Sequence, residues 1–296
     1  MLEGLKQVER HRDREYMNRV ILLSDGLANR GITDVHELRK IAQRYRARSI
    51  SLTTMGVGLD YNENLMMGLS KSGGGNYYFI ESPNSLSSIF RRELRSLACV
   101  AVQNASIEMS LADGVRVRDV IGCDQERDGG KVVISIGDLY AGEARELTIE
   151  LEVPEGTGTL RAVKGVVKYD GKRGWFESWP SFEASIHYTN DLSEVEKNRD
   201  NAIQSKVDVA VSTRNVDQAL QALDQGRKDE AADYIRAAEV NLRSSPVMGS
   251  GAGAAALVEQ ASRLGSFQKL LKDTVDLRKA KKAIQYQNYQ TQKQEK

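Results

Sequence analysis

Cysteine and histidine are scarce in this chain of 296 residues. The two cysteines, Cys99 and Cys123, are too few for the disulfide framework of a small secreted scaffold. We expect both to be buried thiols, with a single disulfide between them as the alternative. The three histidines, His11, His36 and His187, lie far apart, and no H-E-x-x-H or C-x-x-C motif occurs. The local sequence therefore gives no support for a zinc site.

The chain also lacks a charge imbalance and a long hydrophobic run. Lys and Arg number 42 against 41 Asp and Glu, so the net charge is +1, which disfavours nucleic-acid binding through bulk positive charge. The longest apolar run, around Arg19–Ser24, has the length of a strand and not the ~18–20 residues of a membrane span. The N-terminus has no apolar core of signal-peptide type. As written, the sequence predicts a protein without a membrane span that stays in the cytoplasm, unless its true N-terminus carries an export signal.

Residues 1–98 alternate between helix-like and strand-like patterns. The apolar run Asn18–Ser24 ends at Asp25-Gly26, which is typical of a buried parallel strand followed by a turn. Asp34 is positioned to cap a helix that extends to Tyr45. Later segments continue the alternation, with strands over Ser49–Val57 and Asn76–Ile80 and helices over Asn62–Ser70 and Pro83–Leu97. The first stretch is therefore predicted to be an α/β domain with a parallel sheet covered on both faces.

Residues 100–190 change to the alternating period of half-buried strands. Leu147, Ile149, Leu151 and Val153 alternate with polar residues, and turn signals such as Asp113-Gly114 separate the strand-like runs. This stretch is predicted to be an antiparallel β-sandwich. Four aromatic residues cluster late in it, and we expect them to pack in the sandwich core: Trp175, Phe176, Trp179 and Phe182.

Residues 191–296 carry helical signals only. Apolar residues at helical spacing on either side of Gly226 predict a helical hairpin, and Ser244–Gly253 is predicted to be a flexible connector. One last helix is predicted over Ala254–Tyr286. The Gln- and Lys-rich tail Gln287–Lys296 is expected to fray or to be disordered.

Asp25 is the residue most suited to carry chemistry. It directly follows a predicted parallel strand, so it lies at the carboxyl end of the sheet, where open α/β folds bind ligands. Beside the Ser24 hydroxyl and the flexible Gly26, its carboxylate could face a hard cation such as Mg²⁺. It could equally do no more than cap the turn that follows. The residues alone leave both interpretations open.

Several segments together resemble the second half of a bacterial von Willebrand factor type A domain. VILLSDGLANRGITD, SISLTTMGVGLDYNENLMMGLSKSGGGNYYFI and SLSSIFRREL keep that family's spacing over about residues 1–98. Ser24-Asp25-Gly26 matches the family's S-D-G segment, and Gly56-Val57-Gly58 matches its fifth-strand loop. Ile136–Gly142 and Leu151–Gly156 resemble the all-β module that follows this domain in bacterial members.

The resemblance implies a metal-ion-dependent adhesion site. In the family, a D-x-S-x-S motif, a threonine on a second loop and the S-D-G aspartate hold Mg²⁺, and a ligand carboxylate completes its coordination. Only the last of these elements maps onto this chain, at Asp25, because no D-x-S-x-S occurs. We therefore expect Mg²⁺ in the complete domain but not on this chain alone. We also expect the chain to be a fragment, or else another polypeptide to complete its sheet.

No catalytic constellation stands out in the sequence. Paired carboxylates such as Glu150 and Glu152 fall on predicted solvent faces, and Asp60, Asn62 and Asn64 fit a capped turn better than a calcium loop. We therefore predict a non-enzymatic protein that binds a protein partner in an adhesion-type manner, with Ser24, Asp25 and Gly26 at the site. The alternatives are a metal-independent scaffold or assembly subunit, and an accessory to a chaperone-type ATPase.

Overall fold

The computed structural model describes residues 1–13, 16–128, 130–171, 179–249, 253–273 and 276–293. It divides into two compact units, each made of several segments of the chain. Unit 1 comprises Met1–Val115, Cys123–Arg145 and Arg161–Ser185. Unit 2 comprises Arg116–Gly122, Glu146–Leu160 and Ile186–Lys296.

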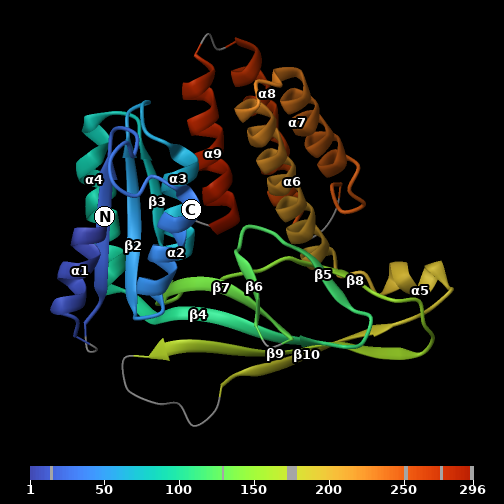
Figure 1. Cartoon of the computed structure of the whole chain (residues 1–296). Helices are drawn as coiled ribbons and strands as arrows, with labels where there is room; N and C mark the ends of the chain where they lie inside the picture. The colour runs from blue at the N-terminus through green and yellow to red at the C-terminus, as the bar shows by residue number, and fades with distance from the viewer. Residues whose placement is uncertain (14–15, 129, 172–178, 250–252, 274–275, 294–296) are drawn as a thin grey trace. The chain divides into compact units, whose positions relative to one another are not determined.

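A three-stranded parallel sheet of order β1-β2-β3 forms the first part of unit 1 (Figure 1). Its strands are β1 (Asn18–Ser24), β2 (Ile50–Val57) and β3 (Gly74–Ile80). Helices alternate with them along the chain, namely α1 (Leu2–Arg10), α2 (Val35–Arg46), α3 (Glu63–Gly73) and α4 (Pro83–Ala98). The predicted alternation of helices and parallel strands is confirmed.

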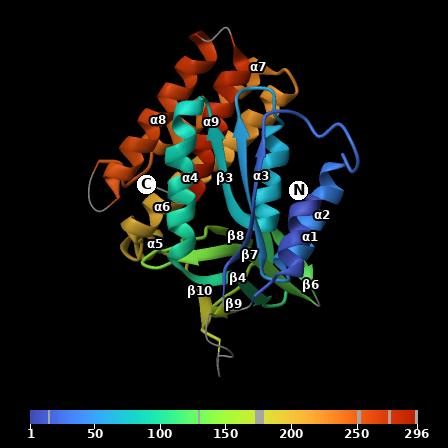
Figure 2. The same ribbon diagram turned by 90° about the vertical axis from the view of Figure 1, so that its left-hand side faces the viewer.

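The side-chain alternation of the strands assigns the two faces of this sheet. Val20, Leu22 and Leu52 point to one face, where they pack with Leu38 of α2 and Leu65 of α3. Intervening strand residues point to the other face, where α4 lies. Figure 2 shows α4 on one side of the strands and α1 and α2 on the other. The sheet is thus covered on both faces, as predicted.

The β-rich stretch forms two antiparallel sheets. A five-stranded sheet has the order β10-β9-β4-β7-β6, with strands β4 (Val100–Leu111), β6 (Gln125–Asp128), β7 (Lys131–Tyr140), β9 (Thr159–Gly171) and β10 (Ser181–His187). A two-stranded sheet pairs β5 (Arg116–Val120) with β8 (Ile149–Glu152) and belongs to unit 2.

Two of the four aromatic residues expected in the sandwich core are partly exposed. Trp179 and Phe182 are each 38% exposed, so the prediction of core packing is wrong for them, and Trp175 and Phe176 lie outside the described residues. Among the described residues, β10 pairs with β9 alone, and the Phe182 ring lies against Gly165 of β9. An edge strand leaves such side chains open to solvent on one side.

Helices make up the rest of unit 2. They are α5 (Leu192–Lys197), α6 (Asn201–Asp224), α7 (Lys228–Arg243), α8 (Ala254–Asp273) and α9 (Leu277–Lys293). The last four share one apolar core that includes Val216, Ile235, Phe267 and Ile284. The predicted helical C-terminal region, with its hairpin of α6 and α7, is confirmed.

The last part of the helical region differs from the prediction in two ways. The single helix expected over Ala254–Tyr286 is two helices, and the Asp276 carboxylate accepts a hydrogen bond from the Arg278 backbone at the start of α9. The tail expected to be disordered from Gln287 is helical as far as Lys293. Asn288 and Gln292 of α9 donate hydrogen bonds to the Asp217 carboxylate of α6 at 2.7 and 2.8 Å, which fixes this polar segment on the bundle.

Both cysteines are free thiols, so no disulfide joins them. Cys99 is exposed and Cys123 is partly buried, so the expectation of two buried thiols is wrong for Cys99. Cys99 is the C-cap residue of α4, where the helix gives way to β4.

Candidate functional site

Ser24, Asp25 and Gly26 lie where β1 ends, at the carboxyl end of the parallel sheet. The Ser24 hydroxyl donates a hydrogen bond to the Gly26 carbonyl oxygen at 3.0 Å, which closes a tight turn around Asp25. Asp25 is exposed, and among the described residues it takes part in no hydrogen bond or ion pair. Its carboxylate is therefore directed to solvent and available to a ligand.

The neighbouring strand ends support this turn. Ser24 is in register with Gly56 of β2, and the Gly58 amide donates to the Ile80 carbonyl of β3 at 2.9 Å. A Cβ at Gly56 would lie 2.1 Å from the Tyr61 ring, so only glycine fits there. The Tyr61 and Tyr77 hydroxyls share a buried hydrogen bond of 2.7 Å. The strand ends next to the S-D-G turn are thus tightly packed.

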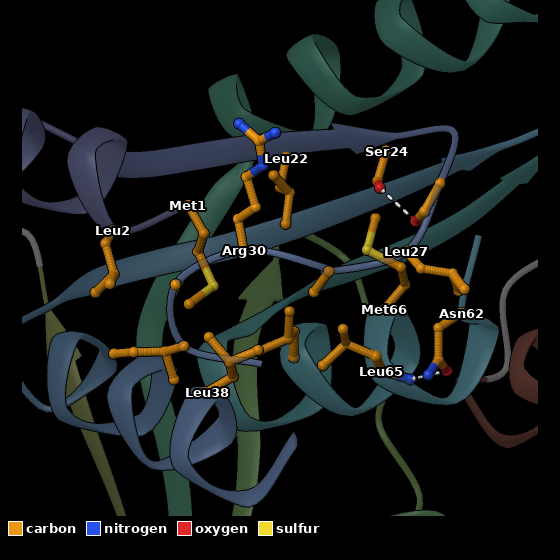
Figure 3. Close-up of a pocket in the computed structure, with 15 residues that line it drawn as sticks. Met1, Leu2, Leu22, Ser24, Leu27, Arg30, Leu38, Asn62, Leu65 and Met66 are labelled. Atoms are coloured by element: carbon orange, nitrogen blue, oxygen red, sulfur yellow. Dashed lines mark hydrogen bonds between the residues drawn. The ribbon is translucent and has the colours of Figure 1, made fainter. Parts of the chain in front are cut away.

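An apolar pocket of about 310 Å³ opens beside this turn (Figure 3). Ser24 and Gly26 line it, whereas Asp25 does not. Its walls come from α1, β1, α2, α3 and the loop after Gly26, with side chains that are mostly aliphatic or sulfur-containing: Met1, Leu2, Leu22, Leu27, Ile32, Leu38, Leu65, Met66 and Leu69. The sequence gives little indication of this pocket, because its apolar residues repeat at the spacing that is typical of an ordinary hydrophobic core.

Comparison with known proteins decides the family of this sheet. Residues 1–92 match the sequence profile of the von Willebrand factor type A domain. These residues belong to the von Willebrand factor type A (VWA) family. Uncharacterized protein YfbK of Escherichia coli (strain K12) is 28% identical over 142 residues, which cover 46% of this chain and 24% of YfbK. The aligned part thus spans about a quarter of that relative.

Solved structures share the fold of the VWA sheet and of the parts after it. A von Willebrand factor type A protein from Catenulispora acidiphila matches 98% of this chain and 70% of its own, with a TM-score of 0.69 and 16% identity. The human COPII-coat protein Sec24c matches 97% of this chain and 42% of its own, with a TM-score of 0.53 and 10% identity. Identities this low show a common fold and nothing about ligands.

Around the S-D-G turn, the described residues present few of the ligands that Mg²⁺ prefers. Mg²⁺ prefers a near-octahedral set of oxygen ligands with one or two carboxylates. Asp25 supplies one carboxylate, and Ser24 uses its hydroxyl hydrogen on Gly26. Within the described part of the chain, no group of three or more His, Cys, Asp and Glu side chains could hold a metal ion. Asn62, part of the calcium-like pattern, instead caps α3 by accepting the Leu65 amide at 2.9 Å.

A buried polar network lies at the amino end of the VWA strands, and sequence reasoning missed it. Arg19 of β1 contacts Glu93 of α4 and Asp138 of β7, each at 2.6 Å, with the three side chains at most 3% exposed. Glu93 also accepts hydrogen bonds from Thr53, Asn76 and Tyr78 at 2.6–3.0 Å, so its carboxylate is fully satisfied.

The electrostatics of Glu93 follow from these contacts. Burial alone would raise the pKa of Glu93, but the Arg19 guanidinium and the three hydrogen bonds together hold it below its ordinary value of 4.5. One signal in the sequence could have revealed the residue. Glu93 lies four residues after Ile89 and four before Leu97, which puts a carboxylate on the apolar stripe of its helix.

Proposed function

We propose that this protein is a non-enzymatic, protein-binding module of the VWA type, whose partner contacts the carboxyl end of the parallel sheet. VWA domains serve protein interaction or adhesion in general. The observation that carries the proposal is the exposed Asp25, free of ion pairs among the described residues, in the S-D-G turn of a VWA sequence. In this proposal Asp25 contacts the partner and Ser24 and Gly26 hold the turn.

Magnesium enters this proposal as an incomplete site. Asp25 would be one ligand. The family's D-x-S-x-S motif, which would supply further ligands, does not occur in this sequence. One carboxylate with one hydroxyl offers little more than any surface aspartate. We therefore expect calorimetric titration of the chain with MgCl₂ to give no saturable heat. Saturable binding that disappears in Asp25→Ala would contradict the incompleteness of the site.

Site-specific crosslinking tests the protein-binding role. A photoreactive amino acid at Leu27, which is 65% exposed beside the turn, should capture a discrete partner in the cells that naturally produce the protein. The matched control is Leu192, which is 79% exposed on α5. Partner capture should occur at Leu27 only and fall sharply in Asp25→Ala. The same bands from both positions, or none from Leu27, would refute the proposal.

A metal-independent scaffold is the second candidate, favoured by the lack of a metal-holding cluster among the described residues. A scaffold needs no carboxylate at the turn. Capture at Leu27 that survives both Asp25→Ala and removal of divalent ions with EDTA would support this candidate over the adhesion-type site. An accessory role beside a chaperone-type ATPase would appear as capture of that ATPase.

A further inference from the structure

The apolar pocket beside the S-D-G turn takes no part in the proposed contact through the Asp25 carboxylate. Its volume of about 310 Å³ lies near the lower end of the ~300–1,000 Å³ typical of ligand pockets. Leu22, Leu38 and Leu65 form its inner wall, on the face of the sheet that α2 and α3 cover. An apolar hollow of this kind gains most by burying a large aliphatic or aromatic side chain.

The outer wall is the loop of residues 27–33, which is held more loosely than its surroundings. Among the described residues, this loop makes no hydrogen bond, and Ile32 is its one residue packed against the core around Leu38 and Leu52. Leu27 and Ala28 are exposed although both line the pocket. The loop can therefore adjust to an occupant without breaking backbone hydrogen bonds.

Arg30 places a positive charge on this loop without a counter-charge. It is exposed, lines the pocket, and pairs with no carboxylate in the described part of the chain. In Figure 3 its side chain runs away from Leu38 and Leu65, and the guanidinium is the part farthest from them. Many other arginines here, such as Arg39 and Arg214, pair with carboxylates. An unpaired guanidinium beside an apolar hollow is complementary to an acidic group next to an apolar one.

We propose that this pocket binds one large apolar side chain of a protein partner, from a segment that carries Asp or Glu beside that residue. The apolar side chain enters between Leu22, Leu38 and Leu65, and the neighbouring carboxylate pairs with Arg30. Because Leu27, Ala28 and Arg30 leave the outer wall open, the pocket does not enclose a free small molecule to the 70–90% usual for such ligands. This inference rests on the proposed protein-binding role and names the partner's chemistry.

A displayed library of random twelve-residue peptides, selected on the full chain, tests this chemistry directly. Enriched peptides should share Leu, Ile, Met or Phe within about two residues of Asp or Glu. A synthetic copy of the best peptide should lose binding when that apolar residue is changed to Ala, and should bind more weakly in high salt. No enrichment, or enrichment of basic or wholly polar peptides, would overturn the proposal.

Variants of the chain assign the binding to the pocket. Ala28→Trp should fill the hollow from an exposed loop position and weaken the peptide at least about tenfold. Arg30→Gln should weaken it about three- to tenfold and reduce its salt dependence. The matched control, Arg95→Gln, changes an exposed arginine of α4 on the other face of the sheet and should leave affinity unchanged. Unchanged affinity in both pocket variants would refute the assignment.

The same peptide separates this inference from the proposed function. Binding lost in Ala28→Trp and Arg30→Gln but intact in Asp25→Ala and in EDTA would support the pocket and count against the carboxylate contact. Binding lost in Asp25→Ala but intact in both pocket variants would do the reverse.

Discussion

At the scale of single residues, Arg19 is a charged group that is almost fully buried in unit 1. It lies near the start of β1 and is opposed by two buried carboxylates, Glu93 and Asp138. Replacement of such a group leaves charges in a medium that solvates them poorly, which costs far more than the loss of a surface ion pair.

Arg19→Met should destabilise unit 1 by about 3–5 kcal/mol, because it leaves Glu93 and Asp138 buried without a counter-charge. Hydrogen exchange of the β2 and β3 amides measures this, since it reports on the sheet alone. The matched control is Arg48→Met in the same unit, whose arginine is 56% exposed beside Glu9 and should contribute less than about 1 kcal/mol. Equal effects of the two variants would show that the buried ion pairs of Arg19 stabilise the sheet no more than an exposed ion pair does.

Glu93 also predicts a direction of acid sensitivity. Its pKa in the folded protein lies below its ordinary value, so its carboxylate stabilises the fold fully above that value, and this contribution is lost as the pH falls through the folded pKa. Glu93→Gln should be less stable than the parent at neutral pH. The difference in free energy of unfolding between variant and parent should become smaller as the pH falls below about 4.5, as measured by denaturant unfolding at each pH. A difference in free energy of unfolding that does not change with pH would show that the Glu93 carboxylate is not responsible for the acid sensitivity.

At the scale of elements, the β2–β3 pairing contains an irregularity that requires glycine. Leu52 pairs with Gly74 and Thr54 with Tyr77, so two residues of β3 oppose Thr53 alone. The Thr53 hydroxyl accepts the Asn76 amide at 3.2 Å and so replaces a missing backbone partner. At Gly75 a Cβ would lie 2.4 Å from the Leu52 carbonyl oxygen, which the backbone cannot easily relieve.

Gly75→Ala should therefore lower the free energy of unfolding by at least about 1–3 kcal/mol, because the two strands must separate to admit the methyl group. Gly265→Ala is the matched control on α8, where a Cβ meets nothing within 4 Å. It should stabilise the helix by roughly 0.5–1 kcal/mol. Thermal unfolding of both variants measures the contrast, and effects of the same sign would contradict it.

Elements were predictable where local signals agreed. β1 spans Asn18–Ser24 as predicted, and Asp34 accepts the Glu37 amide at 2.7 Å as the expected cap of α2. The prediction failed at α9, because a Gln-rich segment looks unstructured until the carboxylate of Asp217 on a distant helix satisfies it. The pocket, the Arg19 network and the exposure of Cys99 likewise depend on contacts between segments far apart in the sequence, which periodicity does not report.

At the scale of the whole molecule, the open side of β1 matters most. Among the described residues, β1 pairs with β2 alone, and its Leu23 is 43% exposed. A long apolar edge strand is a template for pairing with another chain.

Among the described residues, no helix combines the length and the hydropathy that a membrane span requires.

We expect the protein to self-associate at high concentration through β1. Leu23→Lys should shift the equilibrium toward monomer, because a charge on an edge strand opposes strand addition. Sedimentation velocity over a concentration series measures this. Leu192→Lys, at an exposed helical position, is the control and should change nothing. A monomer at every concentration, or equal effects of the two variants, would exclude β1 as the contact.

The Arg19 network also bears on how such proteins can be divided in evolution or in the laboratory. Asp138 belongs to β7, yet it neutralises the guanidinium of Arg19 in β1. Gly137 approaches the Gly74 carbonyl so closely that a Cβ at Gly137 would lie 3.2 Å from that oxygen. A truncation after residue 98 would strip Arg19 of one carboxylate and uncover the end of β3. The parallel sheet and the strand that carries Asp138 should therefore be inherited, transplanted and expressed together.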